Sequence, residues 1–132
     1  MRVVVTGATG LIGRNLVAKL VANGDSVAVL ARNSSKAAKI FPSDVDIYQW
    51  DSNSDSVPLE SLNDSDAIVH LIGEPIKGRW TKSKKLQILQ SREYSTKSLV
   101  TALTTLPNPP LKVIMASAVG YYGDRGDEEL TD

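Results

Sequence analysis

The sequence predicts an α/β fold with a doubly wound parallel sheet in the strand order 3-2-1-4-5. The main observation is that short apolar runs, rich in valine and isoleucine, alternate with segments of helical period, as in consecutive βαβ units. A second observation is a glycine-rich segment between the first apolar run and the first helical segment. The fifth apolar run is the last one in the sequence, so we expect the sheet to stop after its fifth strand.

Five segments are predicted as strands, and most of their residues are apolar. Three successive valines in residues 2–6 are typical of a central strand that is buried on both faces. Residues 45–50 alternate between polar and apolar side chains, which is also a strand pattern. The five predicted strands are residues 2–6, 26–31, 45–50, 67–72 and 112–117.

The first two helices are predicted from spacing and end signals. Residues 11–22 have leucines at helical spacing, and Asn23-Gly24 would end that helix with a left-handed cap. A short helix is expected to start at Ser34 or Ser35 and to end at Ile40, because Pro42 cannot continue it.

A helical turn at residues 59–62 and a long helix at residues 80–106 complete the predicted elements. The long helix is interrupted by a polar stretch, residues 90–97. A dry core would not accept that stretch, so we expect it to face a ligand, with Arg92 as the contact. The lysines and arginines at residues 77–85, by the start of this helix, are expected to be mostly solvated.

Length and composition limit the possible functions. A chain of 132 residues allows one domain, and 42% hydrophobic with 23% charged residues is an ordinary globular composition. The 15 basic and 15 acidic side chains cancel, which argues against nucleic-acid binding, and the absence of cysteine excludes disulfides and thiolate metal sites. No apolar run approaches the ~18 residues of a membrane span, and no signal peptide is evident. We expect a cytoplasmic protein without metal, nucleic-acid or membrane partners.

The glycines Gly7, Gly10 and Gly13 lie directly between the first predicted strand and the first helix. Such a turn brings backbone N–H groups and a helix N-terminus against a pyrophosphate, and a side chain at Gly7 or Gly10 would obstruct the turn or the phosphate. Gly13 would let the helix lie close to the strand. A turn used only for packing is the alternative. The position favours dinucleotide binding, with residues 1–132 as one Rossmann-type domain.

Ala31-Arg32 ends the second predicted strand, where a cofactor without a 2′-phosphate would be expected to meet an acidic side chain. An acid would repel a 2′-phosphate, whereas a guanidinium binds it through charge-assisted hydrogen bonds of about 1.5–3 kcal/mol. NADP is therefore favoured over NAD. The alternative is a solvated arginine after a strand.

Further candidate residues follow the other strands at the same carboxyl edge. Asp51 could accept a hydrogen bond from the adenine amino group, or could simply end its strand at the surface. Gly73 would let the backbone approach the nicotinamide ribose, and His70 is left without a role. The Ser117 hydroxyl could hydrogen-bond a substrate carbonyl or hydroxyl, with a strand-end turn as the alternative.

The ordered set of motifs resembles the extended short-chain dehydrogenase/reductase superfamily, and within it the sugar-nucleotide-epimerase-like branch of epimerase family proteins. The glycine turn alone is common to a large superfamily, but the later motifs are specific to this branch. The motifs extend over the whole chain; they are TGATGLIG (6–13), AR (31–32), WD (50–51), HLIGEPI (70–76), RW (79–80), KK-x-x-I-x-x-SR (84–92) and SAVGYYGDRGDEELTD (117–132).

The resemblance implies an NADP-binding domain with specific contacts. Arg32 would bind the 2′-phosphate, and Arg92 would contact the cofactor at a position where the wider superfamily commonly has asparagine. Ser117 matches the catalytic serine of the superfamily. The phosphates would lie against Gly7, Thr9, Gly10, Leu11 and Ile12, and the cofactor ribose against Leu71, Ile72 and Gly73.

The chain departs from the superfamily in one important respect. The superfamily transfers protons with a tyrosine and a lysine in a Tyr-x-x-x-Lys pair. The sequence contains no such pair, and Tyr121 and Tyr122 lack a lysine at that spacing. We also expect the substrate-binding part of such proteins to lie outside these 132 residues.

Two functions are therefore expected as alternatives. The first is the NADP-binding domain of a nucleotide-sugar epimerase or reductase-like protein, which acts by hydride transfer on a hydroxyl-bearing small molecule. The second is a non-enzymatic NAD(P)-binding module for redox sensing or regulation. In either case, we expect the open edge of the fifth strand to promote self-association.

Overall fold

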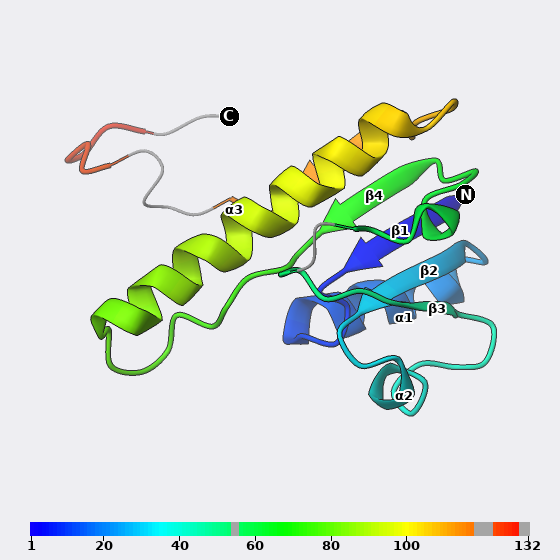
Figure 1. The fold of residues 1–132 in the computed structure, drawn as a ribbon, viewed down its shortest axis with the longest axis horizontal. Helices are drawn as coiled ribbons and strands as arrows, with labels where there is room; N and C mark the ends of the chain where they lie inside the picture. Colours follow the sequence, from blue (N-terminus) through cyan, green and yellow to red (C-terminus); the bar gives the residue numbers. More distant parts are fainter. Residues whose placement is uncertain (54–55, 118–122, 130–132) are drawn as a thin grey trace.

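The computed structural model describes residues 1–53, 56–117 and 123–129, and contains the predicted parallel sheet (Figure 1). Its order is β3-β2-β1-β4-β5, and every neighbouring pair is parallel. This confirms the predicted fold class and strand order. The strands are β1 (Arg2–Thr6), β2 (Ser26–Ala31), β3 (Asp46–Gln49), β4 (Ala67–His70) and β5 (Lys112–Met115).

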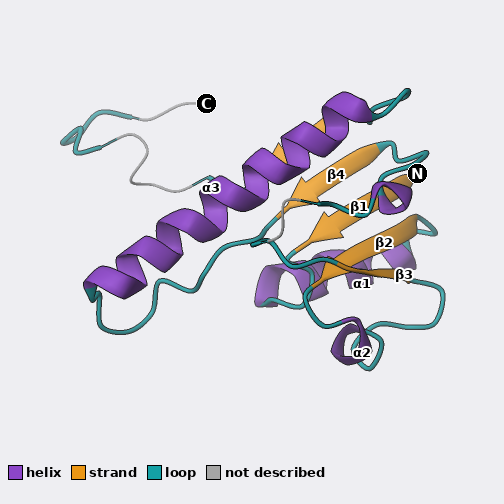
Figure 2. Ribbon diagram, in the orientation of Figure 1, coloured by secondary structure: helices purple, strands orange, loops and turns teal. Residues whose placement is uncertain are grey.

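Helices cover both faces of the sheet (Figure 2). Val3 and Val5 of β1 belong to a core shared with α1 (Leu11–Ala22) and α2 (Ser34–Ala37). Val4 belongs to a second core, shared with α3 (Lys82–Thr105) and with Val57 and Leu62, which flank the short 3₁₀ helix η1 (Leu59–Ser61). Alternate side chains of one strand thus enter opposite layers. The predicted burial of β1 on both faces is confirmed, since Val4 and Val5 are 0% exposed.

Several strands end earlier than predicted. The expected strand 67–72 ends at His70, and the expected strand 112–117 ends at Met115. The reason is the hydrogen-bond register, in which His70 pairs with Thr6 on one side and Met115 on the other. Thr6 is the last residue of β1, because Gly7 turns the chain with a φ of +67°. The pairing therefore ends at the same level on β1, β4 and β5.

The ends of α1 agree with the prediction, whereas those of α2 differ from it. The predicted left-handed cap of α1 is present, with Gly24 at a φ of +79° and the Asp25 N–H donating to the Leu20 carbonyl at 3.0 Å. The helix α2 is capped by Asn33 rather than by a serine, since its Oδ1 accepts from the Lys36 N–H at 2.8 Å. It ends at Ala37, before the predicted Ile40.

The long helix α3 begins after Thr81, whose Oγ1 accepts a hydrogen bond from the Lys84 N–H at 3.1 Å. No helix in the described ranges has both the length and the apolar character needed to cross a bilayer. Within the same ranges, no group of three or more His, Asp or Glu side chains is placed to hold a metal ion.

Candidate functional site

A cleft of about 240 Å³ lies at the carboxyl edge of the sheet, where the chain leaves β1 in one direction and β4 in the other. This is the point at which doubly wound sheets bind ligands. Its lining includes eight predicted site residues, namely Gly7, Thr9, Gly10, Ala31, Arg32, Leu71, Ile72 and Gly73. Residues that were not predicted also line it, namely Leu30, Trp50, Ser52, Glu74, Pro75 and Ser91.

The three glycines of the turn have different surroundings. A Cβ on Gly7 would lie 2.7 Å from the carbonyl carbon of Leu71, so this glycine lets the turn approach the segment after β4. A Cβ on Gly13 would lie 2.5 Å from the Ala8 Cα, so the first turn of α1 packs on the glycine turn itself. A Cβ on Gly10 would meet only the Gly7 carbonyl oxygen, at 3.3 Å. Apart from that one close contact, the space beside Gly10 is open.

The N-terminus of α1 is available to an anion. Gly10 is its N-cap and supplies no side-chain hydrogen bond to the first turn, which contains no acidic residue. The first-turn N–H groups have no intrahelical partners, and they carry the positive end of the helix dipole. The side chains of Leu11 and Ile12 are 83% and 70% exposed and do not line the cleft, so any contact from these residues would be through their backbone.

Charged side chains surround the other side of the cleft. The Glu74 carboxylate accepts a hydrogen bond from the Lys84 Nζ at 2.6 Å. This bond lowers the pKa of Glu74 below its ordinary value, and the charges of Lys84, Arg32 and Arg92 lower it further. The Arg32 side chain is exposed and makes no hydrogen bond or ion pair with the described residues. Arg32 is therefore free to bind an anion.

Arg92 contacts the backbone of Glu74, a residue that lines the cleft. Its Nη1 donates to the Ile88 carbonyl at 3.0 Å and to the Glu74 carbonyl at 3.4 Å. A Cβ on Gly73 would lie 2.8 Å from the Arg92 Nη2, so Gly73 makes room for this guanidinium. Arg92 does not line the cleft. Its contact with a cofactor, and the approach of Gly73 to a ribose, both stay predictions.

A buried hydrogen-bond network behind the cleft was not predicted. The His70 Nδ1 lies 2.7 Å from the Thr6 Oγ1, and its Nε2 lies 3.1 Å from the Ser95 Oγ. The three residues are 4%, 0% and 0% exposed. Burial lowers the pKa of His70 below its ordinary value, which favours the neutral imidazole. Part of the polar stretch of α3 is thus explained by a partner in the protein.

The last two predicted site residues lie outside the cleft. Asp51 is exposed, and its Oδ1 accepts a hydrogen bond from the Asn53 N–H at 3.0 Å, while its neighbours Trp50 and Ser52 line the cleft. Ser117 is exposed and follows β5 by two residues. The adenine contact of Asp51 and the catalytic role of Ser117 stay predictions. Residues 118–122 and 130–132 of the last motif lie outside the described residues.

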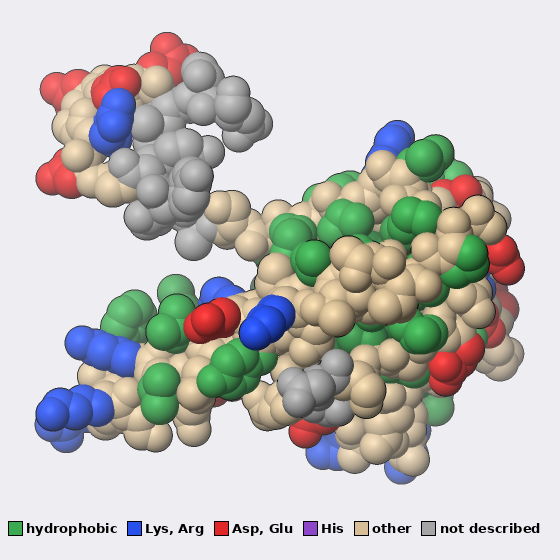
Figure 3. Space-filling view, turned by 45° about the horizontal axis from the view of Figure 1, so that its top comes forward, with side chains coloured by type: hydrophobic (Ala, Val, Ile, Leu, Met, Phe, Trp, Pro, Cys, Tyr) green, Lys and Arg blue, Asp and Glu red, His purple; other side chains and the backbone are tan. Residues whose placement is uncertain are grey.

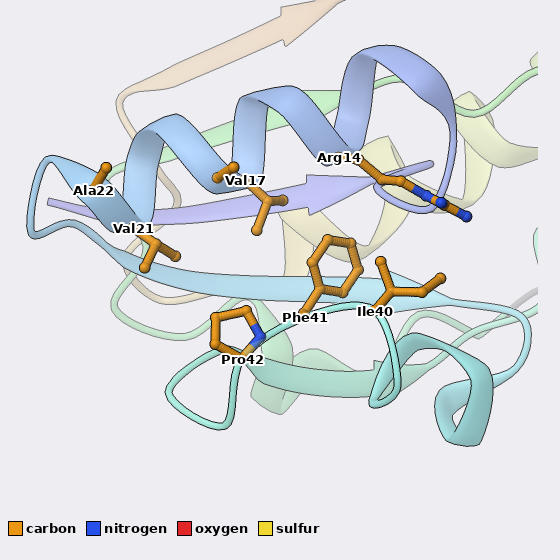
Figure 4. Close-up of a pocket in the computed structure, with 8 residues that line it drawn as sticks. Arg14, Val17, Val21, Ala22, Ile40, Phe41 and Pro42 are labelled. Carbon is orange, nitrogen blue, oxygen red and sulfur yellow. The ribbon is translucent and has the colours of Figure 1, made fainter.

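A larger cavity, of about 520 Å³, lies between α1 and the segment after α2 (Figure 4). Its lining contains no predicted site residue and is apolar apart from Arg14, whose Nε donates to the Thr9 carbonyl at 2.8 Å. An apolar lining offers few partners to a pyrophosphate, so the smaller cleft is the better dinucleotide site.

The basic residues before and at the start of α3 lie on the surface. Lys77, Arg79, Lys82 and Lys85 are exposed, and Figure 3 shows lysine and arginine side chains at the projecting end of this helix. Only Lys84 turns inward, to Glu74. This agrees with the prediction that most of the basic group is solvated.

Comparisons with known proteins identify the family of the chain. The sequence profile of the NAD dependent epimerase/dehydratase family matches residues 3–132. The epimerase family protein SDR39U1 homolog, chloroplastic, of Arabidopsis thaliana is 40% identical over 125 residues, which are 93% of this chain and 36% of that protein. Epimerase family protein YfhF of Bacillus subtilis is 32% identical over 132 residues, which are 100% of this chain and 42% of that protein.

A solved structure shows the same relationship. The crystal structure of human epimerase family protein SDR39U1 with NADPH has a TM-score of 0.71 and 32% sequence identity, and the match covers 92% of this chain and 38% of that chain. The chain thus spans about two fifths of the length of these relatives or less. Because the family profile matches nearly all of its residues, the chain belongs to the NAD dependent epimerase/dehydratase family.

Proposed function

We propose that this chain is the NADP-binding domain of an epimerase- or reductase-like protein. The observation that carries the proposal is the cleft at the carboxyl edge of the sheet. It combines the glycine turn, the uncapped N-terminus of α1 and the unpaired guanidinium of Arg32. A pyrophosphate fits the first two features and a 2′-phosphate fits the third.

The charge distribution favours NADP over NAD. No acidic side chain follows β2 in the cleft lining, and the one carboxylate that does line it, Glu74, is neutralised by Lys84. The positive groups near Glu74 therefore outnumber the negative ones. The similarity to human SDR39U1, whose structure is with NADPH, supports the same choice.

In the whole protein, the domain would hold the cofactor beside a hydroxyl-bearing small molecule. The similarity to MoeE5, 26% identical and solved in complex with UDP-glucose and NAD, supports a nucleotide sugar as its class. The nicotinamide ring would accept or return a hydride. Ser117, at the carboxyl edge after β5, would hydrogen-bond the substrate oxygen. A second candidate is a non-enzymatic NAD(P)-binding redox-sensing or regulatory module, which the absence of a Tyr-x-x-x-Lys pair from these 132 residues favours.

The test replaces the side chain assigned to the 2′-phosphate. In Arg32→Glu, the new carboxylate should repel the 2′-phosphate and weaken NADPH binding at least about tenfold, while NADH binding is unchanged or stronger. Calorimetric titration of both cofactors measures this. Lys39→Glu makes the same change of charge at an exposed position outside the cleft lining, and should leave both affinities within about twofold.

One outcome would contradict the preference for NADP, and another would contradict cofactor binding itself. Equal losses for NADPH and NADH in Arg32→Glu would show that Arg32 contacts a shared part of the cofactors, and the preference for NADP would be wrong. If the unmodified chain bound neither cofactor, the whole proposed function would be wrong.

A further inference from the structure

We propose that His70 is a positioning residue for the cofactor cleft. As a neutral imidazole with its proton on Nε2, it connects Thr6 to Ser95 and so fixes residues 71–74 against the glycine turn. The inference rests on the proposed function, because the effect it assigns to His70 is on cofactor affinity. It concerns a residue behind the cleft, which does not line it.

The contacts of Ser95 determine the proton on Nε2. The Ser95 Oγ lies 2.7 Å from the Ser91 carbonyl oxygen, which can only accept, so the single hydroxyl proton of Ser95 is donated there. The same Oγ lies 3.1 Å from the His70 Nε2. Since the Ser95 proton is already used, Nε2 must be the donor in this contact.

The contacts of Thr6 determine the other nitrogen. The Thr6 Oγ1 accepts a hydrogen bond from the Leu71 N–H at 3.3 Å and lies 2.7 Å from the His70 Nδ1. The Thr6 hydroxyl proton has a partner if Nδ1 is its acceptor, and none of the other contacts of this hydroxyl in the described chain offers one. The hydrogen bonds therefore run in one direction, from Leu71 through Thr6 to His70, and from His70 through Ser95 to Ser91.

Residues 71–74 are held at both ends by Thr6 and Ser91, which lie at the two ends of this directed chain. At one end, the Leu71 N–H is bonded to Thr6, and at the other, the Glu74 N–H donates to the Ser91 Oγ at 2.9 Å. The β-ladder ends at His70, and the Leu71 N–H is shared between the Thr6 carbonyl at 3.2 Å and the Thr6 Oγ1. One backbone bond and two side-chain bonds therefore position the segment beyond the ladder. All four residues of the segment line the cleft.

The same bonds position the glycine turn. Thr6 directly precedes Gly7, whose α-carbon faces the Leu71 carbonyl so closely that a Cβ would lie 2.7 Å from it. A displacement of Leu71 relative to Thr6 would therefore alter the distance between the two walls of the cleft. Binding sites lose affinity when such spacing loosens by a fraction of an ångström.

The experiment uses two matched pairs of variants of the chain. Thr6→Val keeps the size of the buried side chain but removes its hydroxyl, whereas Thr6→Ser keeps the hydroxyl. Ser95→Ala removes the hydroxyl that accepts from Nε2. Thr104→Ala removes an exposed hydroxyl of α3 whose one bond within the described residues is to the Thr101 carbonyl of its own helix. Each protein is titrated with NADPH and with NADH, and its thermal unfolding is followed without cofactor.

We expect Thr6→Val and Ser95→Ala to weaken both cofactors by a similar factor of about five or more, because residues 71–74 would contact a part that the cofactors share. Thr6→Ser and Thr104→Ala should bind both within about twofold of the unmodified chain. In ¹⁵N NMR spectra, His70 should show a protonated Nε2 and an unprotonated Nδ1. This spectrum tests the hydrogen-bond directions independently of any ligand.

Three results would overturn the inference. The first is an Nδ1-protonated tautomer, and the second is unchanged cofactor affinity in folded Thr6→Val and Ser95→Ala. The third is a loss confined to NADPH, which would assign the effect to the 2′-phosphate. If the unmodified chain bound neither cofactor, the proposed function itself would fail, and the inference would fall with it even if the NMR tautomer were as expected.

Discussion

Gly10 and Gly13 are three residues apart in one motif, but a side chain at each position would meet a different obstacle. At Gly10, a Cβ has only the Gly7 carbonyl oxygen within 4 Å, at 3.3 Å, and the backbone φ of −75° suits any residue. At Gly13, a Cβ would collide with the backbone of Ala8 at 2.5 Å. We therefore expect Gly10 to serve binding and Gly13 to serve folding.

This difference gives a prediction for two alanine variants. Gly10→Ala should weaken NADPH binding more than about tenfold, because the methyl group occupies space at the phosphates, while stability changes by less than about 1 kcal/mol. Gly13→Ala should lower the free energy of unfolding by about 1–3 kcal/mol, through overpacking. Denaturant unfolding and NADPH titration of both variants check this. Retained binding in Gly10→Ala would contradict the phosphate site.

His70 gives a prediction for the dependence of stability on pH. Burial lowers its pKa in the folded chain below the ordinary value of about 6.5 that the unfolded chain has. Between these two pKa values the unfolded chain binds more protons, so stability rises with pH across this window and is lost as pH falls through it. Above about pH 6.5, the contribution of His70 should be constant.

Denaturant unfolding at a series of pH values measures this contribution. His70 is the only histidine of the chain, so His70→Asn should remove the dependence just below pH 6.5 and leave the dependence at lower pH to the carboxylates. An identical slope in the variant would show that His70 does not carry it.

The sequence predicts the motifs of the cleft, but not all of the side chains that line it or lie behind it. The glycine turn and Arg32 are found by motif and position, and the structure places both in the cleft lining. At the end of β3, the sequence points to Asp51, but the side chains that line the cleft belong to Trp50 and Ser52. The His70 network needs the register between β1 and β4, which depends on tertiary pairing and not on local pattern.

At the level of elements, the periodicity of the sequence predicts which helices and strands form, and tertiary contacts determine the residues at which they end. The ranges of β1, α1 and β2 agree with the prediction, since apolar spacing and glycine punctuation coincide there. The predicted strands at residues 45–50, 67–72 and 112–117 are longer than the observed ones, because apolar residues continue past the last paired position. Those extra residues include Leu71 and Ile72, which line the cleft.

The strand β5 gives a prediction about association. Its side chains Val113, Ile114 and Met115 are 42%, 56% and 40% exposed, and β4 is its one partner in the described sheet. An open edge with apolar side chains favours pairing with another chain. We therefore predict that the chain forms dimers at high concentration, as measured by light scattering.

A charge on this strand should reverse the association. Ile114→Lys should shift the chain toward the monomer, because a charged side chain opposes pairing at a strand edge. Leu89→Lys makes the same kind of change at a 59% exposed position of α3 and should leave the dimer intact. A monomer at every concentration of the unmodified chain would contradict the prediction.

At the level of the whole molecule, the cleft depends on segments that are distant in sequence. It is lined from the turn after β1, the end of β2, the segment after β3, the segment after β4 and the middle of α3. The parallel sheet brings these segments together because it places the carboxyl ends of its strands along one edge. The proposed cofactor site is thus built from residues that the chain itself contains.

We expect catalysis to need groups that these 132 residues do not contain. The chain has no Tyr-x-x-x-Lys pair, and it spans 36% of the length of its Arabidopsis relative. General acid–base catalysis contributes about 10²–10⁴-fold, and positioning of the substrate contributes considerably more. Ser117 is exposed beyond the end of β5, and a serine hydroxyl without an adjacent base is a weak nucleophile and a poor proton acceptor.

We therefore predict that this chain binds NADPH without turning over a substrate. The purified chain would be incubated with NADPH and a panel of sugar nucleotides, aldehydes and ketones, while the absorbance of the reduced cofactor and the formation of epimers are followed. Calorimetry on the same sample confirms that the cofactor is bound, so that a lack of turnover reflects missing chemistry rather than missing cofactor. Turnover that Ser117→Ala abolishes would contradict the prediction, because it would place the catalytic proton transfer within these residues.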